Sequence, residues 1–151
     1  MGFFKNIMNK ITGGGAKVTI EVLEPKLDAP FTVKVTAVIG DSELKVSKVY
    51  LYIKENEHAV VRNVEIPDSN GGTTREDVEG DEEVYRTEVI MSGPEVLEAK
   101  KTYEWTKEVS LPSSAAPTFE GKYISHSWHF FAGIDAPGND PDSGWIDVEI
   151  C

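Results

Sequence analysis

The feature that most constrains the fold is a two-residue alternation in the last third of the chain. One face of a strand would carry Tyr123, Ser125, Ser127, His129 and Phe131, and the other Ile124, His126, Trp128 and Phe130. Because aromatic side chains fall on both faces, we expect a central strand that is at least partly covered on each side. A Pro-, Gly- and Asp-rich turn over residues 135–144 and a final alternating strand over residues 145–150 follow it.

The same alternation recurs upstream. Apolar and polar residues alternate over residues 17–22, 31–37, 45–54, 84–91 and 101–111, and residues 59–66 are expected to form a short strand. Links rich in turn-forming residues separate these segments. About eight strands at this spacing are typical of an antiparallel β-sandwich, so we expect an all-β, immunoglobulin-like sandwich.

Two segments in the middle of the chain are expected to lack strand structure. Residues 67–74 (PDSNGGTT) are a strong turn signal. Residues 75–83 contain six acidic side chains, which cannot be buried together, and this predicts an exposed loop.

The first fifteen residues are expected to form a separate unit. Apolar side chains at spacings of three and four predict a short amphipathic helix that ends at three consecutive glycines; the apolar residues are Phe3, Phe4, Ile7, Met8 and Ile11. The first twenty residues carry three lysines and no acid. The helix either docks on the sandwich or is exchanged between protomers, or it binds a partner or a membrane surface. Residues 16–151 are then a single sandwich domain.

Composition excludes several classes of protein. The chain has 151 residues, 26 acidic and 15 basic, and the net charge of −11 repels a phosphate backbone, so nucleic acid is not an expected partner. The single cysteine, Cys151, cannot form an internal disulfide. No apolar run is long enough to span a bilayer, and no signal peptide is recognisable. We therefore expect a cytoplasmic protein, peripheral at a membrane if the helix binds lipid.

Several segments resemble a known family. They are the start MGFFK, residues 119–124 (FEGKYI), residues 132–137 (AGIDAP) and residues 140–145 (DPDSGW). These resemble the N-terminal sandwich of arrestin-like proteins, and within them the bacterial sporulation-control family. The resemblance implies an arrestin-like β-sandwich that acts as a scaffold or regulatory adaptor without catalysis. Arrestin-like proteins usually pair two sandwiches, whereas this chain ends at Cys151, so it is either a one-domain member or part of a longer chain.

Candidate sites for small ligands are few. Asp135, Asp140 and Asp142 form a candidate cation loop, although the fixed ligand spacing of an EF-hand is missing and a turn with Asp side chains bonded to local N–H groups is the alternative. His126 and His129 point to opposite faces of a strand and cannot chelate one metal ion together. No Gly-x-Ser-x-Gly nucleophile motif is present. No metal or cofactor is expected.

Two functions remain open. The first is a non-catalytic adaptor that binds a protein partner, or a second copy of itself, through a sheet edge or through the N-terminal stripe of Phe3, Phe4, Ile7, Met8 and Ile11. The second is a carbohydrate- or small-ligand-binding sandwich, in which exposed Trp and Tyr side chains would line up on one solvent face. An enzyme is not expected.

Overall fold

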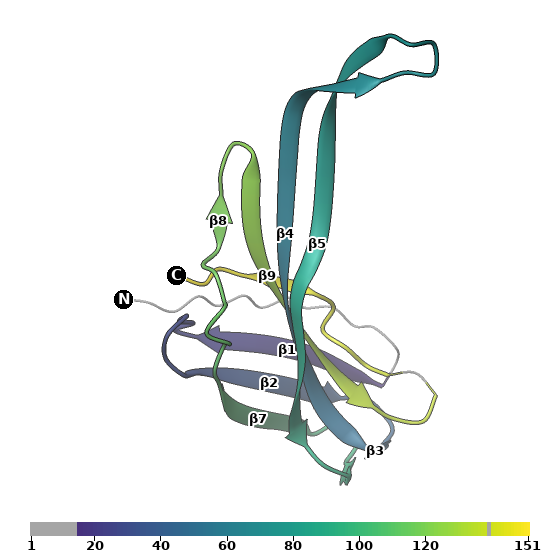
Figure 1. Cartoon of the computed structure of the whole chain (residues 1–151). Coiled ribbons are helices and arrows are strands. Elements are labelled where there is room, and N and C mark those ends of the chain that lie inside the picture. The colour runs from purple at the N-terminus through teal and green to yellow at the C-terminus, as the bar shows by residue number, and fades with distance from the viewer. Residues whose placement is uncertain (1–14, 139) are drawn as a thin grey trace.

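A computed structural model of the chain describes residues 15–138 and 140–151. In this part the chain forms strands and turns and no helix (Figure 1). The strands are β1 (Ala16–Leu23), β2 (Phe31–Ile39), β3 (Leu44–Val46), β4 (Lys48–Pro67), β5 (Thr73–Ser92), β6 (Glu95–Leu97), β7 (Thr102–Val109), β8 (Phe119–Glu120), β9 (Ile124–Asp135) and β10 (Ile146–Val148). The expected all-β class is confirmed.

The strands pair antiparallel in two main sheets. One sheet has the order β1-β2-β7, and the other has the order β10-β9-β4-β5 with β8 paired to β9. A small ribbon of β3 and β6 lies beside them. Figure 1 shows the three-stranded sheet crossing the lower half of the longer sheet, so that the two sheets form a sandwich.

The core lies between the facing sides of these two sheets. Alternate residues point inward, as in β1 with Val18 and Ile20 and in β4 with Leu51 and Ile53, all of which are at most 1% exposed. β9 lies between β10 and β4, so it is a central strand as expected. Trp128 on its inward face is 1% exposed, and Phe131 on its outer face is half-buried. Each fully buried side chain contributes about 1.5–3 kcal/mol through burial. The two-residue alternation of the sequence is therefore the pattern of core contacts.

The prediction of a loop over residues 75–83 is wrong, because these residues lie in β5 and pair with β4. Residues 59–66 do form a strand, as expected, but they are the second half of the twenty-residue β4 and not a separate short strand. Strand pairing satisfies backbone N–H and C=O groups without burying side chains, so the acidic residues stay exposed. The turn between the strands is confirmed: the Asp68 carboxylate accepts the N–H groups of Asn70 at 2.9 Å and Gly72 at 3.0 Å.

Gly133 is needed because the ring of Tyr50 lies directly over it. The two residues are register partners in β9 and β4. A Cβ atom at Gly133 would lie 2.3 Å from the Tyr50 hydroxyl oxygen and 2.4 Å from Cζ, both far inside van der Waals contact. This close approach lets the Tyr50 ring lie flat on the sheet, where it is only 8% exposed.

We predict that Gly133→Ala lowers the free energy of unfolding by about 1–3 kcal/mol, because the new methyl group must displace the Tyr50 ring. Urea denaturation measures this loss. The matched control is Gly93→Ala, where no atom lies within 4 Å of the new Cβ. Equal stability of the two variants would contradict the packing described for Tyr50.

Candidate interaction surface

The β4–β5 hairpin extends well beyond the sandwich. β4 and β5 are twenty residues each and pair with each other from Val49 to Pro67 of β4. β9 accompanies β4 only as far as Ala59, and the last β4 residue of the core is Ile53. Figure 1 shows the free part of this hairpin projecting from the sandwich. We call residues 55–85 the arm.

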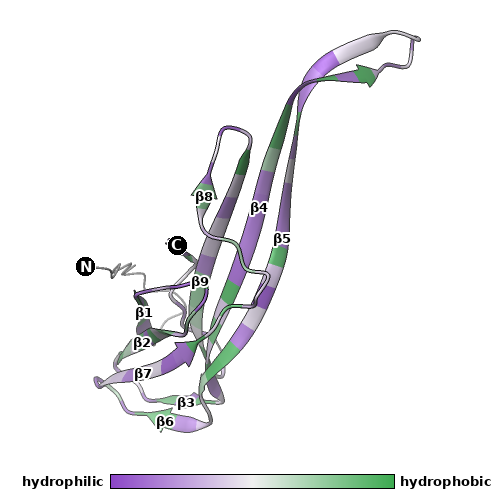
Figure 2. Ribbon diagram, turned by 60° about the vertical axis from the view of Figure 1, so that its left-hand side comes forward, coloured by the Kyte–Doolittle hydropathy of each residue, from purple (hydrophilic) through white to green (hydrophobic). Residues whose placement is uncertain are grey.

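The arm carries most of the net charge of the chain. It contains ten acidic residues and only two basic ones, Arg62 and Arg75, so it accounts for eight of the eleven net negative charges. Figure 2 shows that hydrophilic and hydrophobic residues alternate along the arm. The arm therefore presents a strongly negative surface interrupted by apolar positions.

A bulge organised by Asp77 interrupts the pairing in the upper arm, where Figure 1 shows the hairpin bending. The register between β4 and β5 shifts between Val61 and Val64, and Asn63 adopts a left-handed conformation with φ of 58°. The Asp77 carboxylate accepts the Asn63 N–H at 2.9 Å and the Arg62 Nη1–H at 3.1 Å. One carboxylate thus stabilises both the bulge and the bend.

At the base of the arm, the inward-facing row of β4 changes from apolar to acidic. Glu55 follows Ile53 on this face and is 5% exposed. Its carboxylate accepts the Ala116 N–H at 3.0 Å, and the Ala116 carbonyl accepts the indole N–H of Trp128 at 2.8 Å. The segment around Ala116 therefore closes the core at this end and satisfies the buried carboxylate.

The next rows of the inward face contain small and apolar residues. Glu57 pairs with His126 of β9 and with Glu82 of β5, and the His126 Nε2 atom lies 3.3 Å from the Glu57 carboxylate. One row further out, Ala59 pairs with Ile124 and with Gly80. Directly paired residues share a face of the sheet, so the single methyl group of Ala59 and the absence of a side chain at Gly80 leave a depression there.

Two adjoining cavities occupy this depression. The first, of about 240 Å³, is the acidic hollow, lined by Glu57, Ala59, Gly80, Asp81 and Glu82. The second, of about 380 Å³, is the apolar groove, lined by Ala59, Val60, Val61, Arg62, Tyr123 and Ile124.

The rim of the apolar groove is exposed. Val61 is 58% exposed and Ile124 is 54% exposed, and Val78, the register partner of Val61, is 44% exposed. An apolar cavity bordered by carboxylates has the chemistry to receive an apolar side chain flanked by basic groups.

The residues of the candidate cation loop take part in local turn contacts. Asp140 accepts the Ala136 N–H at 3.2 Å, and Asp142 accepts the Gly144 N–H at 2.8 Å. Within residues 15–138 and 140–151, no three His, Cys, Asp or Glu side chains are placed to hold a metal ion. The expected N-terminal stripe of Phe3, Phe4, Ile7, Met8 and Ile11 lies outside the described residues.

Aromatic side chains do line one outer face of the longer sheet, as expected of a ligand-binding sandwich. They are Tyr50, Tyr52, Phe131 and Trp145, with neighbouring ring centroids 5.0–6.5 Å apart. Lys54 Nζ, however, lies 4.1 Å from the centroid of Trp145, and the Arg86 guanidinium lies 5.4 Å from it. Two of these ring pairs are stacked and three are tilted, and cations partly cover the rings. The rings therefore form a packed cluster that holds Trp145 on the sheet.

Sequence reasoning missed a hydrogen-bonded row on the same outer face. Ser127 Oγ lies 2.9 Å from His129 Nε2, and His129 Nδ1 lies 2.7 Å from Asp147 Oδ1. The Ser-x-His spacing on an alternating strand was the available signal, because it places both side chains on one face. A serine hydroxyl, an imidazole and a carboxylate are bonded in the same order in the catalytic triad of serine hydrolases. The Asp147 side chain is 91% exposed, however, so water competes for the hydrogen bond that would orient the imidazole.

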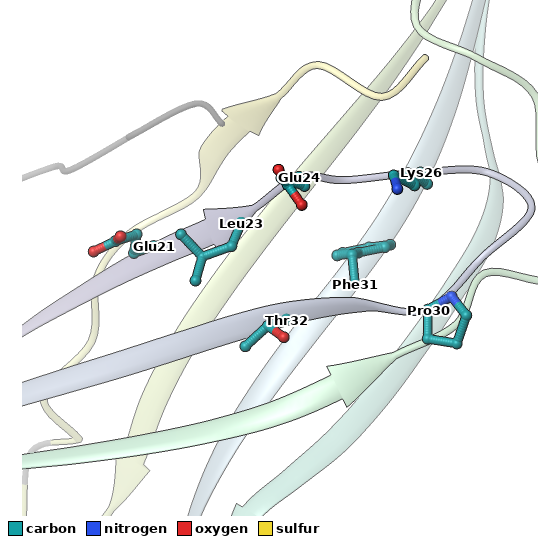
Figure 3. A pocket seen from close by; sticks show the side chains of 7 residues that line it. All are labelled: Glu21, Leu23, Glu24, Lys26, Pro30, Phe31 and Thr32. Carbon is teal, nitrogen blue, oxygen red and sulfur yellow. The ribbon is translucent and has the colours of Figure 1, made fainter. Parts of the chain in front are cut away.

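A third cavity lies at the link between β1 and β2, away from the arm. Figure 3 shows its lining, with Glu21 and Leu23 on β1, Glu24 and Lys26 on the link, and Pro30, Phe31 and Thr32 at the start of β2. Its volume is about 480 Å³. The polar groups of this lining are two carboxylates, a lysine and a threonine, and Glu21 lies 3.7 Å from Lys34 in an ion pair. We find no acid–base pair aimed into it.

The two packed antiparallel sheets form a β-sandwich with an arrestin-like fold. The structure of Spo0M, a sporulation control protein from Bacillus subtilis, is similar to the chain, with a TM-score of 0.60 at 14% sequence identity. The match covers 91% of this chain and 49% of the Spo0M chain, so the chain spans about half the length of that protein. The fold-level resemblance expected from the sequence is confirmed. No protein-family model matches the chain, and no curated protein matches it in sequence.

One further finding concerns membranes. In the part of the chain that the structure describes, no helix is long and apolar enough to cross a bilayer.

We predict that Asp77→Ala speeds amide hydrogen exchange at Asn63 about two- to tenfold, because the Asn63 N–H loses its acceptor. The global free energy of unfolding changes by less than about 0.5 kcal/mol, since the bulge lies outside the core. Glu79→Ala, on the same strand and also exposed, is the control and leaves the exchange at Asn63 unchanged. A similar exchange rate at Asn63 in both variants would rule out this role for Asp77.

A second prediction concerns pH. Burial, and after it the negative charges of Asp140, Tyr52, Asp142 and Asp135, raise the pKa of Tyr50 from 10.0 to about 12. The unfolded chain therefore loses this proton first, and the free energy of unfolding falls as pH rises from 10.0 to about 12.

Tyr50→Phe removes the tyrosine that titrates, so the free energy of unfolding of this variant falls less steeply with rising pH. Urea denaturation from about pH 9 to about pH 12 measures the slope. Tyr123→Phe, at a position that is 44% exposed, is the control and keeps the wild-type slope. A Tyr50→Phe variant with the wild-type slope would show that Tyr50 does not titrate abnormally.

Proposed function

We propose that this chain is a non-catalytic, regulatory arrestin-like adaptor that works through protein–protein contacts in the cytoplasm, and that the arm is its binding surface. The observation that carries the proposal is the apolar groove bordered by the acidic hollow, at the point where the hairpin leaves the core. The partner is a protein segment that places an apolar side chain among lysines or arginines. Similarity in fold to Spo0M, a sporulation control protein, supports a regulatory role.

The chemistry of the arm supports a protein partner over other classes. Its net charge repels nucleic acid and anionic lipid, and its apolar rim favours an amphipathic ligand over an isolated cation. The long β5 edge carries acidic side chains, which oppose pairing with another copy of itself. A basic segment meets no such repulsion.

The alternative function, binding of a carbohydrate or small ligand, rests on the outer aromatic cluster. A sugar stacks on an exposed ring face, whereas the face of Trp145 is occupied by Lys54 at 4.1 Å. The arm is therefore the better supported surface.

The proposal is tested with three synthetic peptides and the full chain. The first alternates apolar residues with lysine, the second has glutamate in place of lysine, and the third has serine in place of the apolar residues. Fluorescence anisotropy at low and raised salt measures binding. We expect the first peptide alone to bind, with an affinity that falls as salt rises.

The matched variants separate the arm from general charge. The double substitution Glu57→Gln and Glu82→Gln lowers the affinity for the first peptide about two- to tenfold, because each neutralised carboxylate removes a modest charge interaction. Glu104→Gln with Glu108→Gln, two exposed positions on β7, makes the same change in net charge and leaves binding unchanged. Equal binding of all three peptides, or equal weakening by both pairs, would overturn the proposal.

A further inference from the structure

The arm and the first residues of this chain are complementary in charge and in apolar content. Residues 1–14 carry Lys5 and Lys10 and no acid, whereas the arm carries ten acids and two bases. The N-terminal residues also supply apolar side chains at helical spacing, led by Phe3 and Ile7. The chain therefore contains both a basic amphipathic segment and a surface suited to one.

The geometry of the depression fits such a segment. An apolar side chain that enters between the Glu57–Glu82 row and the Val61–Val78 row meets Ala59 and Gly80 at the bottom. Lysines beside it then lie near the carboxylates of the acidic hollow. Arg62, the basic residue of the groove, is already paired with Asp77 at 3.1 Å, which reduces its repulsion of an incoming lysine.

The distance along the sandwich favours the segment of a second copy over the segment of the same copy. Gly15 lies against Leu44 and its carbonyl accepts the Gly40 N–H, at the end of the sandwich where β4 begins. From Lys48 to Ala59, β4 rises by about 36 Å. The amphipathic helix expected from the sequence over residues 2–11 would span about 15 Å, and three extended residues would add about 10 Å, so the segment of the same copy would fall short.

We infer that two copies of this chain associate by exchange, with the N-terminal segment of each copy seated in the apolar groove of the other. The inference rests on the proposed function, since it names an occupant of the same surface. An exchange of this kind is symmetric and gives two identical contacts per dimer. It also means that an external basic partner competes with the chain's own N-terminal segment.

The experiment uses the full chain and three variants in analytical ultracentrifugation. The stripe variant is Phe3→Ser with Ile7→Ser, and the groove variant is Val61→Ser with Ile124→Ser. The control is Val38→Ser with Val96→Ser, at apolar positions away from the arm that are 44% and 52% exposed. Val61 and Ile124 are exposed, so their loss leaves the core intact.

We expect the wild type and the control to dimerise, with an association constant that falls as salt rises. The stripe variant and the groove variant each lose at least about tenfold in association constant. An equimolar mixture of these two variants forms a heterodimer, because one supplies an intact segment and the other an intact groove. That heterodimer has a single contact and is weaker than the wild-type dimer.

Three results would overturn the inference. They are a monomeric wild type at every concentration, a mixture without heterodimer, and a stripe variant whose association constant equals that of the wild type. If the arm still binds the lysine peptide in such a case, this inference fails and the proposed function stands. If the lysine peptide does not bind either, both fail.

Discussion

The backbone pairing of β4 with β5 is the interaction on which the rest of the structure depends. In its lower half, β4 carries Leu51 and Ile53 into the core while it pairs with β5 on one side and β9 on the other. In its upper half the same ladder continues with no core beneath it. Hydrogen bonds between the two strands satisfy the backbone there, and solvent satisfies the side chains. A single hairpin thus forms one side of the longer sheet and also the projecting arm.

The sandwich was predictable because core contacts have a signature in the side chains. The alternation around Val18, Leu51 and Trp128 predicts which residues face inward, and all three are buried in the structure. The arm was not predictable in the same way, because strand pairing outside a core leaves no pattern of burial to read. The six acidic residues between positions 75 and 83 correctly predicted that this segment is exposed. They gave no sign that it forms a strand. Exposure and irregular structure are separate properties, and the charge run reports only the first.

The candidate surface shows the same limit. Ala59 and Gly80 are ordinary residues in the sequence, and only the register of β4 with β5 places them opposite each other. The hydrogen bonds from Ser127 through His129 to Asp147 likewise depend on the pairing of β9 with β10. The Ser127-x-His129 spacing is visible in the sequence, but the third member, Asp147, and the pairing of Ala59 with Gly80 have no local motif. The candidate cation loop did have local signals, and the structure shows two of its three carboxylates, those of Asp140 and Asp142, bonded to nearby N–H groups.

The end of the core at Ile53 has a consequence for how this protein can vary. Glu55 and Tyr85, at the base of the arm, still contact the core. Most side chains between them are exposed and add little to folding, so their substitution is close to neutral for the stability of the sandwich. The core residues and most of the exposed residues therefore lie in different stretches of one hairpin. The exposed surface of the arm can therefore change in sequence without compensating changes between the sheets.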